Sequence, residues 1–231
     1  MSKALTQTAL TAAVTTALLA GAAITSTASA EVSANIGFTS NYMFRGITQT
    51  DDQAAVQGGL DYEHEGGFYA GTWASNVDFG GGDTGYEIDG YFGVAGGIGD
   101  SGVGFDVGYI YYAYPTLDDA DLGELYGALD FMGFYGMVNF VTNADTSELE
   151  DTLSYELGYA FDIMSDTSLG ATVGYVDPDE GDGDYTWWSL YATKVTDLGD
   201  FTFAYTQNDI DAPQGSNIDD PRVNVSYVMS F

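Results

Sequence analysis

The segment that decides the fold is Arg222–Phe231, RVNVSYVMSF, at the end of the printed sequence. From Val223 to Phe231 every second residue is apolar or aromatic, and the residues between them are polar apart from Val228. This alternation predicts a β-strand with one apolar and one polar face. Soluble domains commonly end in a loose polar tail, but here the last side chain still belongs to the strand pattern.

The same alternation recurs along the rest of the chain after residue 30. Helical periodicity is nearly absent, and most alternating segments have the length of about ten residues that a tilted membrane strand needs. In three segments, 67–78, 134–142 and 168–176, the alternation does not fix which face is apolar. The sequence predicts about twelve strands, at 32–45, 53–62, 67–78, 86–97, 103–114, 122–131, 134–142, 151–161, 168–176, 185–195, 200–208 and 222–231.

The connections between the predicted strands alternate in length. Those after even-numbered strands are short, and those after odd-numbered strands are mostly longer and more acidic. This pattern is typical of an outer-membrane barrel with short periplasmic turns and long extracellular loops. We therefore predict an all-β fold, a transmembrane antiparallel up-and-down β-barrel of about twelve strands with periplasmic termini. A soluble two-sheet sandwich would also alternate, but it explains neither the loop asymmetry nor the terminal Phe231.

Residues 1–30 have the features of a secretory signal peptide. Lys3 is followed by a mostly apolar run over 10–24 and by Ala28-Ser29-Ala30, an A-x-A cleavage site. A membrane anchor is the alternative, but threonines dilute the apolar run and it is short for a span. The predicted domains are a signal peptide at 1–30 and a barrel at 31–231, exported to the bacterial outer membrane.

The composition excludes several classes of protein. The formal net charge is −31, and only Arg45, Lys194 and Arg222 are basic after residue 30, so nucleic-acid binding is excluded. There is no cysteine, hence no disulfide framework, and no cofactor is predicted. Aromatic residues make up 15% of the chain, which argues against a disordered acidic protein.

The segment Ser40–Gln49, SNYMFRGITQ, resembles the opening strand of the TorF family of proteobacterial porins. Weaker similarities lie at Gly59–Tyr62, Tyr86–Asp89 and Asp106–Tyr109, and the resemblance runs over nearly all of residues 31–231. It implies an outer-membrane porin-like barrel and says little about the transported solute. The terminal Phe231 also resembles the signal that the outer-membrane assembly machinery recognises. Outer-membrane lipid and lipopolysaccharide are the other expected partners.

The polar strand faces are rich in carboxylates and poor in cations. A carboxylate-lined lumen favours cations over anions, so we predict passive diffusion of small solutes with a preference for cations. Three alternatives stay open: carboxylates paired with the cations in a plugged barrel, a closed adhesive barrel acting through its acidic loops, and a channel dedicated to one nutrient. The candidate lumen residues are Arg45, Asp61, Glu87, Asp89, Asp106, Glu124, Asp130, Glu156, Lys194 and Arg222.

Arg45 stands out among these candidates. It ends the first predicted strand beside Gly46, at the expected outer mouth of the barrel. It could position anionic groups, or pair with Glu87 or Asp89, and a structural salt bridge is slightly favoured.

The acidic loop 177–184 offers oxygen ligands for a divalent cation. Its spacing is not that of an EF-hand, so a solvated loop is favoured over a metal site. The weak metal candidates are Asp177, Asp179, Asp182 and Asp184.

Two further motifs carry little chemistry. Gly97–Gly102 matches G-x-G-x-x-G, but no helix follows, so it is predicted to be a turn. His64 is the sole histidine and lies in a short predicted turn. No nucleophile and base can be assembled around it, so no catalytic residue is predicted and an envelope enzyme is the least favoured alternative.

Overall fold

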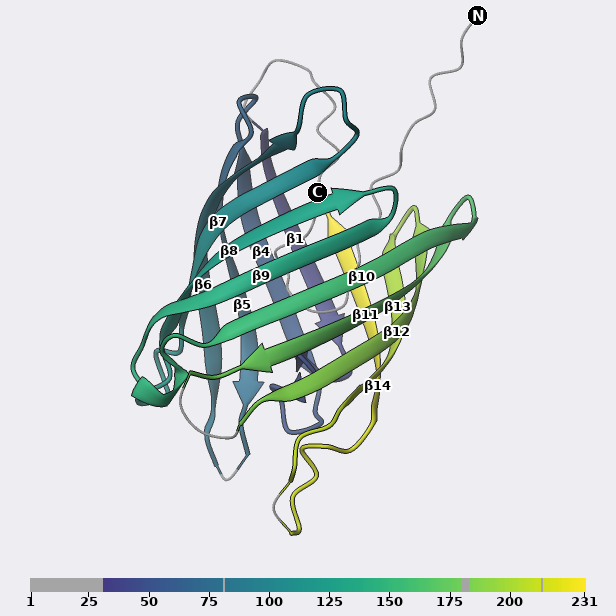
Figure 1. Cartoon of the computed structure of the whole chain (residues 1–231). Helices are drawn as coiled ribbons and strands as arrows, with labels where there is room; N and C mark the ends of the chain where they lie inside the picture. Colours follow the sequence, from purple (N-terminus) through teal and green to yellow (C-terminus); the bar gives the residue numbers. More distant parts are fainter. Residues whose placement is uncertain (1–30, 81, 180–182, 213) are drawn as a thin grey trace, which may run out of the picture.

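In the computed structural model, the alternating segments form a closed antiparallel barrel of twelve strands (Figure 1). The structure describes residues 31–80, 82–179, 183–212 and 214–231, and the predicted signal peptide lies outside them. Within these ranges, no helix has the length and apolar character of a membrane span. The wall strands are β1 (Glu31–Thr39), β4 (Ala55–Glu63), β5 (Phe68–Asp78), β6 (Thr84–Gly97), β7 (Gly104–Ala113), β8 (Leu122–Phe131), β9 (Phe134–Ala144), β10 (Leu153–Met164), β11 (Thr167–Asp177), β12 (Tyr185–Thr196), β13 (Gly199–Asn208) and β14 (Arg222–Ser230).

The barrel closes between its first and last strands. β1 pairs with β4 on one side and with β14 on the other. The final residue takes part, because Phe231 N donates to the Ala34 carbonyl at 2.9 Å and Ala34 N donates to the Phe231 carbonyl at 3.0 Å. The C-terminal segment is therefore part of the wall, as its alternation predicts.

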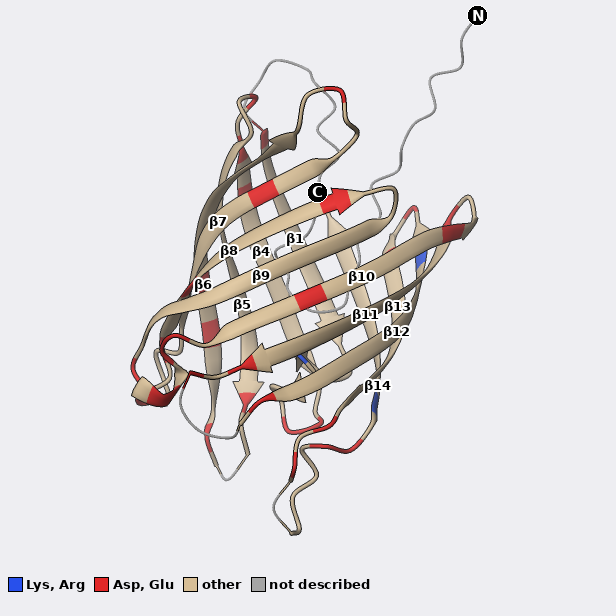
Figure 2. Ribbon diagram, in the orientation of Figure 1, with Lys and Arg blue, Asp and Glu red and all other residues tan. Residues whose placement is uncertain are grey.

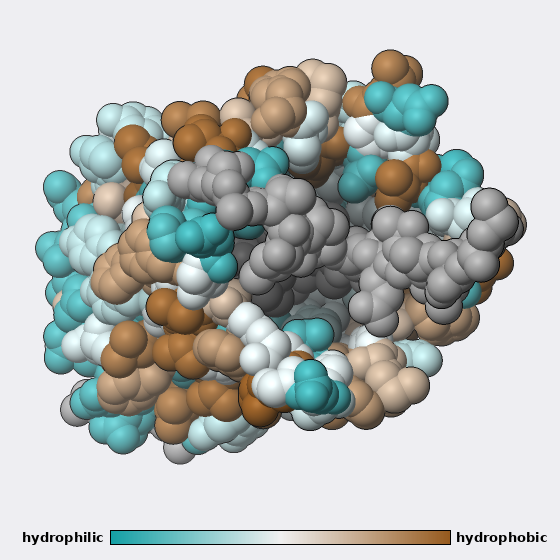
Figure 3. All heavy atoms as spheres, turned by 90° about the horizontal axis from the view of Figure 1, so that it is seen from above, coloured by the Kyte–Doolittle hydropathy of each residue, from teal (hydrophilic) through white to brown (hydrophobic). Residues whose placement is uncertain are grey.

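The two faces of the wall differ sharply in polarity. Large apolar side chains cover the exterior, such as Leu157, which is 59% exposed, and Phe203, which is 54% exposed. Figure 3, viewed from above Figure 1, shows apolar residues gathered along the outer wall. Inward positions are buried and largely polar, including Glu124, Ser189 and Thr202. An apolar exterior around a polar interior is the arrangement of a transmembrane barrel, whose backbone is satisfied by closure.

The exterior predicts a strong penalty for charge on the lipid face. Leu157 lies on the outer face of β10, well inside the strand. We expect Leu157→Arg to lower the free energy of unfolding by about 2 kcal/mol, because a cation there must sit in hydrocarbon. Urea unfolding of the barrel in lipid vesicles measures the change. Leu198→Arg, in the turn after β12, is the matched control and should change stability little; equal losses would contradict the assignment of the lipid face.

Aromatic side chains inside the barrel lie against glycines of the neighbouring strand. Tyr191, for example, stands directly opposite Gly170, where a Cβ would collide with its ring. Because glycine has no Cβ, the opposite ring can lie flat along the wall. The pairs with this arrangement are Gly71–Tyr91, Gly93–Tyr69, Gly108–Tyr126, Gly158–Tyr135, Gly170–Tyr191 and Gly174–Trp187.

The two ends of the barrel differ as the loop lengths predict. The start of β1 and the end of β14 lie at the end of the barrel that carries the short turns. The connection between β13 and β14 projects from the opposite end (Figure 1). A short 3₁₀ turn, η1 (Ser147–Leu149), lies in one of the longer connections at that opposite end.

The first predicted strand is too long. The wall strand stops at Thr39, so Tyr42 and Phe44, which the predicted strand 32–45 includes, lie inside the barrel and not in the wall. Their rings pack on Trp73 and Tyr112, with ring centroids 5.5 and 5.9 Å apart, respectively. Alternation continued past the end of the strand because aromatic residues line part of the lumen as well as the lipid face.

Candidate functional site

The connection from β1 to β4, residues 40–54, folds into the lumen, and we call it the inward segment. Its two short strands, β2 (Met43–Phe44) and β3 (Ile47–Thr48), pair as a small hairpin. Arg45 and Gly46 form the tip with φ values of 45° and 83°. A Cβ at Gly46 would collide with Trp187 of β12, so this position requires glycine. The tip therefore reaches the wall on the far side of β13 and β14.

Arg45 makes a buried two-pronged ion pair with Glu124 of β8. Its Nη1 lies 2.6 Å from Glu124 Oε1 and its Nη2 lies 2.8 Å from Oε2. Its Nε is 3.9 Å from Glu156 Oε1, and Tyr112 donates to Glu124 Oε2 at 3.2 Å. Paired guanidinium and carboxylate forks are among the strongest polar contacts in proteins. The structural ion pair is thus present, but its partner is Glu124 rather than the predicted Glu87 or Asp89.

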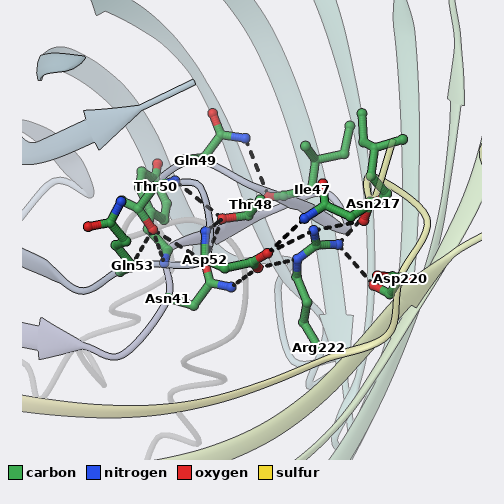
Figure 4. Close-up of polar contacts among 12 residues, drawn as sticks. Asn41, Ile47, Thr48, Gln49, Thr50, Asp52, Gln53, Asn217, Asp220 and Arg222 are labelled. Carbon is green, nitrogen blue, oxygen red and sulfur yellow. Dashed lines mark hydrogen bonds and ion pairs between the residues drawn. The ribbon is translucent and has the colours of Figure 1, made fainter. Parts of the chain in front are cut away.

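A second cation holds the other end of the inward segment (Figure 4). Arg222 of β14 contacts both carboxylate oxygens of Asp52, at 2.5 and 3.3 Å. It also donates to the backbone carbonyls of Asn217, Ile218 and Asp220. Because Asn41 donates to Asp52 at 2.8 Å, this single carboxylate joins both ends of the inward segment to the loop 209–221.

Glu87 and Asp89 lie side by side on the lumen face of β6 and have fewer partners. They are 1% and 4% exposed. Tyr114 donates to Glu87 Oε1 at 3.1 Å. Among the described residues, Glu87 Oε2 and Asp89 Oδ1 have no hydrogen-bond partner. Together with Glu124 and Glu156, they form a layer of four buried carboxylates in the half of the lumen nearer the long loops.

The other predicted lumen carboxylates lie towards the turn end of the barrel. Asp61 accepts a hydrogen bond from the Tyr91 hydroxyl, and Asp106 accepts one from Tyr69 at 2.6 Å. Asp130 has the inward phase of β8 but is exposed near the end of the strand. These residues share the polar face predicted for them, and they are separate from the Arg45 layer.

Lys194 does not lie in the lumen, and this prediction is corrected. It shares the outer phase of β12 with Leu190 and stands opposite the exposed Phe201 of β13. Its ammonium binds Asp166 in the neighbouring turn, and this hydrogen bond lowers the pKa of the Asp166 carboxyl. The sequence misled here because a lysine near a strand end can reach water from either face.

The sequence pattern alone also did not identify Asp52, Trp187 and Asn208 as residues that contact the inward segment or form part of it. Asn208 Nδ2 donates to the Gly46 carbonyl at 2.8 Å, so it holds the tip of the inward segment. The one available signal is Arg45-Gly46 itself, a rare cation beside a flexible residue in a chain with very few cations.

The remaining candidates belong to loops and turns. Asp177, Asp179 and Asp184 lie around the acidic loop, where Tyr175 donates to Asp184 at 2.9 Å, while Asp182 lies outside the described residues. In the part of the chain that the structure describes, no group of three or more His, Cys, Asp or Glu residues is placed to hold a metal ion. His64 Nδ1 accepts from Gly66 N at 3.0 Å within the turn after β4.

The barrel is similar to solved outer-membrane channels. A KdgM porin superposes with a TM-score of 0.57 at 6% identity, covering 86% of this chain and 98% of the porin. The COG4313 outer membrane channel from Pseudomonas putida F1 gives 0.57 at 10% identity, over 89% and 96% of the two chains. A KdgM porin in complex with disordered oligogalacturonate gives 0.52 at 5% identity, over 88% and 98%. At these identities the likeness shows the fold alone. No curated protein matches the chain.

Sequence comparison places the chain in a family. The family model described as "Bacterial protein of unknown function (Gcw_chp)" matches residues 23–228. The match does not confirm the TorF name that the Ser40–Gln49 motif suggests. The chain belongs to the Gcw_chp family, and its fold is that of outer-membrane channels.

Proposed function

We propose that this protein is an outer-membrane channel for the passive diffusion of small solutes, with a preference for cations. The closed wall, its apolar exterior and its polar interior support a channel. The likeness to solved outer-membrane channels in fold is consistent with this role.

The observation that carries the proposal is a set of buried polar atoms inside the barrel that have no hydrogen-bond partner among the described residues. A packed interior satisfies nearly all of its buried polar groups, because each unpaired one costs about 1–3 kcal/mol. Water in the lumen would satisfy these atoms. They come from several wall strands and from the tip of the inward segment: Arg45 Nε, Glu87 Oε2, Asp89 Oδ1, Asn139 Nδ2, Ser154 Oγ, Trp187 Nε1, Tyr191 Oη and Asn224 Oδ1.

The charges inside the barrel support the preference for cations. The inward arginines, Arg45 and Arg222, are both engaged by carboxylates, which leaves Glu87 and Asp89 without a cationic partner in the described chain. Figure 2 shows how few basic residues the barrel carries beside its acidic ones. A lumen with an excess of carboxylates lowers the energy of cations relative to anions.

The test is current through a planar lipid bilayer separating two KCl concentrations. We expect stepwise conductance and a reversal potential that favours potassium. The double variant Glu87→Gln/Asp89→Asn should move the reversal potential towards zero, because it removes two lumen charges. The control Glu148→Gln, on the exposed η1 turn, should leave it nearly unchanged. A reversal potential that favours chloride would contradict the proposed preference.

A second candidate is a plugged barrel that acts through its acidic loops. The inward segment favours it, because Arg45 and Asp52 bind it to the wall at two places across the lumen. Heat-modifiable gel mobility reports whether the barrel has folded. A folded, inserted barrel that carries no current would overturn the channel and favour this candidate.

The surroundings of the barrel are part of the same proposal. We place both termini and the short turns in the periplasm, and the long acidic loops outside, among lipopolysaccharide. Recognition of Phe231 by the assembly machinery predicts that Phe231→Ala lowers the amount of folded barrel in the outer membrane.

A further inference from the structure

We propose that Asp89, with Glu87 beside it, forms a binding site for an organic ammonium cation in the lumen. The proposal rests on the channel function above and names a class of solute for it. It also defines a site that can be measured without any current.

The site is built on three adjacent strands. Asp89 of β6 stands directly between Trp73 of β5 and Tyr112 of β7, which are its partners in the two ladders. Trp73 and Tyr112 are 6% and 4% exposed, so both rings lie on the lumen face beside the carboxylate. The wall thus presents a carboxylate flanked by two aromatic rings.

The inward segment adds two more rings over this row. Tyr42 packs edge-on against Trp73 at 5.5 Å, with an interplanar angle of 64°. Phe44 packs edge-on against Tyr112 at 5.9 Å and 68°. Four aromatic side chains from the wall and the inward segment therefore surround the region of Asp89.

Each carboxylate of this site has one oxygen without a hydrogen-bond partner among the described residues, and neither has a cationic partner there. Glu87 Oε2 and Asp89 Oδ1 are buried and unpaired among the described residues. By contrast, Glu124 holds Arg45 through both of its oxygens. Burying a carboxylate without a partner is costly. A cation that enters this region would supply the charge partner that these carboxylates lack.

The surroundings favour an organic ammonium over a metal ion. Small divalent cations prefer six or more oxygen ligands, and no three His, Cys, Asp or Glu side chains among the described residues are placed to hold one metal ion together. Aromatic faces attract alkylated ammonium groups, which are weakly hydrated and cover apolar surface. Arg45 shows the same chemistry within the chain, since its guanidinium carbon lies 4.6 Å from the Phe44 ring centre.

Access to the site depends on the inward segment. Tyr42 and Phe44 lie in or next to the β2–β3 hairpin, which is a separate sheet and not a strand of the wall. They can shift without opening the barrel, because the wall strands pair independently of β2 and β3.

Tryptophan emission of the full-length protein, extracted folded in detergent, provides the test. Trp73 lies opposite Asp89, so its emission should change as tetramethylammonium chloride replaces KCl at constant ionic strength. We expect a saturable change whose half-saturation concentration rises about tenfold or more in Asp89→Asn. Asp130→Asn, which removes a lumen carboxylate near the turn end, is the matched control and should titrate like the parent. Trp73→Phe should remove the signal.

Folding of each variant is checked by heat-modifiable mobility, and Glu87→Gln serves as a second variant if Asp89→Asn does not fold. A non-saturable response, or the same half-saturation in parent and both carboxylate variants, would overturn the site. A saturable response to potassium as strong as that to tetramethylammonium would overturn its preference for organic cations.

Current recordings separate this proposal from the channel function. Tetramethylammonium should reduce the potassium current at concentrations that saturate the emission change. A barrel with potassium current but no saturable emission change retains the channel and loses the site. A barrel with the emission change but no current retains the site and loses the channel.

Discussion

Glu124→Gln is expected to lower the free energy of unfolding by about 3 kcal/mol, because it leaves Arg45 buried without its carboxylate partner. Glu124 is 1% exposed and binds Arg45 through both oxygens. Glu156, at 3.9 Å from Arg45 Nε, is too distant to replace that fork. A glutamine offers only one acceptor and no charge, so the tip of the inward segment should detach.

Two measurements check this expectation. Urea unfolding in lipid vesicles gives the stability change, and hydrogen exchange of the backbone amides in residues 41–53 reports release of the segment. The same substitution at the exposed Glu148 is the control, and it should alter neither. If the amides of residues 41–53 exchanged as slowly in Glu124→Gln as in the parent, the Arg45–Glu124 ion pair would not be what holds the inward segment in the lumen.

Arg222→Met is expected to lower the free energy of unfolding by about 3 kcal/mol, through a different set of contacts. Arg222 joins Asp52 to three backbone carbonyls of the 209–221 loop. Methionine keeps the apolar stem and loses every donor, so these acceptors are left to water or to no partner. Because Asp52 is partly exposed, most of the loss should come from the carbonyls rather than from the ion pair.

The control for Arg222→Met is Asp220→Asn. Asp220 contributes only its backbone carbonyl to the Arg222 network, so this change should leave urea unfolding close to that of the parent. Equal destabilisation by both variants would mean that the Arg222 side-chain contacts are not what stabilises this loop.

The wall strands could be predicted from the sequence because the lipid environment constrains which residues each face of a strand can carry. A strand with hydrocarbon on one face and a polar lumen on the other must alternate, as Leu153–Phe161 does. The third predicted strand had no clear phase because Trp73 and Val77 face inward there, while Ala74 and Asn76 take the outer positions. In this segment both faces carry apolar or aromatic side chains, so the alternation does not separate them.

Only part of the candidate site could be predicted from the sequence. Burial of Glu87, Asp89, Glu124 and Glu156 on the inner face follows from strand phase. Their partners do not, because the Arg45–Glu124 contact joins positions 79 residues apart through a segment that leaves the wall. Local pattern carries no information on where such a segment turns, and its tip depends on two successive residues with positive φ.

The paired glycines and aromatic rings of the inner wall give the barrel an adjustable bore. A ring that rests on a glycine occupies little of the cross-section, whereas a larger residue beneath it would tilt the ring towards the axis. The six pairs lie at several heights and on most of the circumference. Exchanging one small residue could therefore narrow the passage at a chosen depth while the charges, the strand register and the lipid face all stayed as they are.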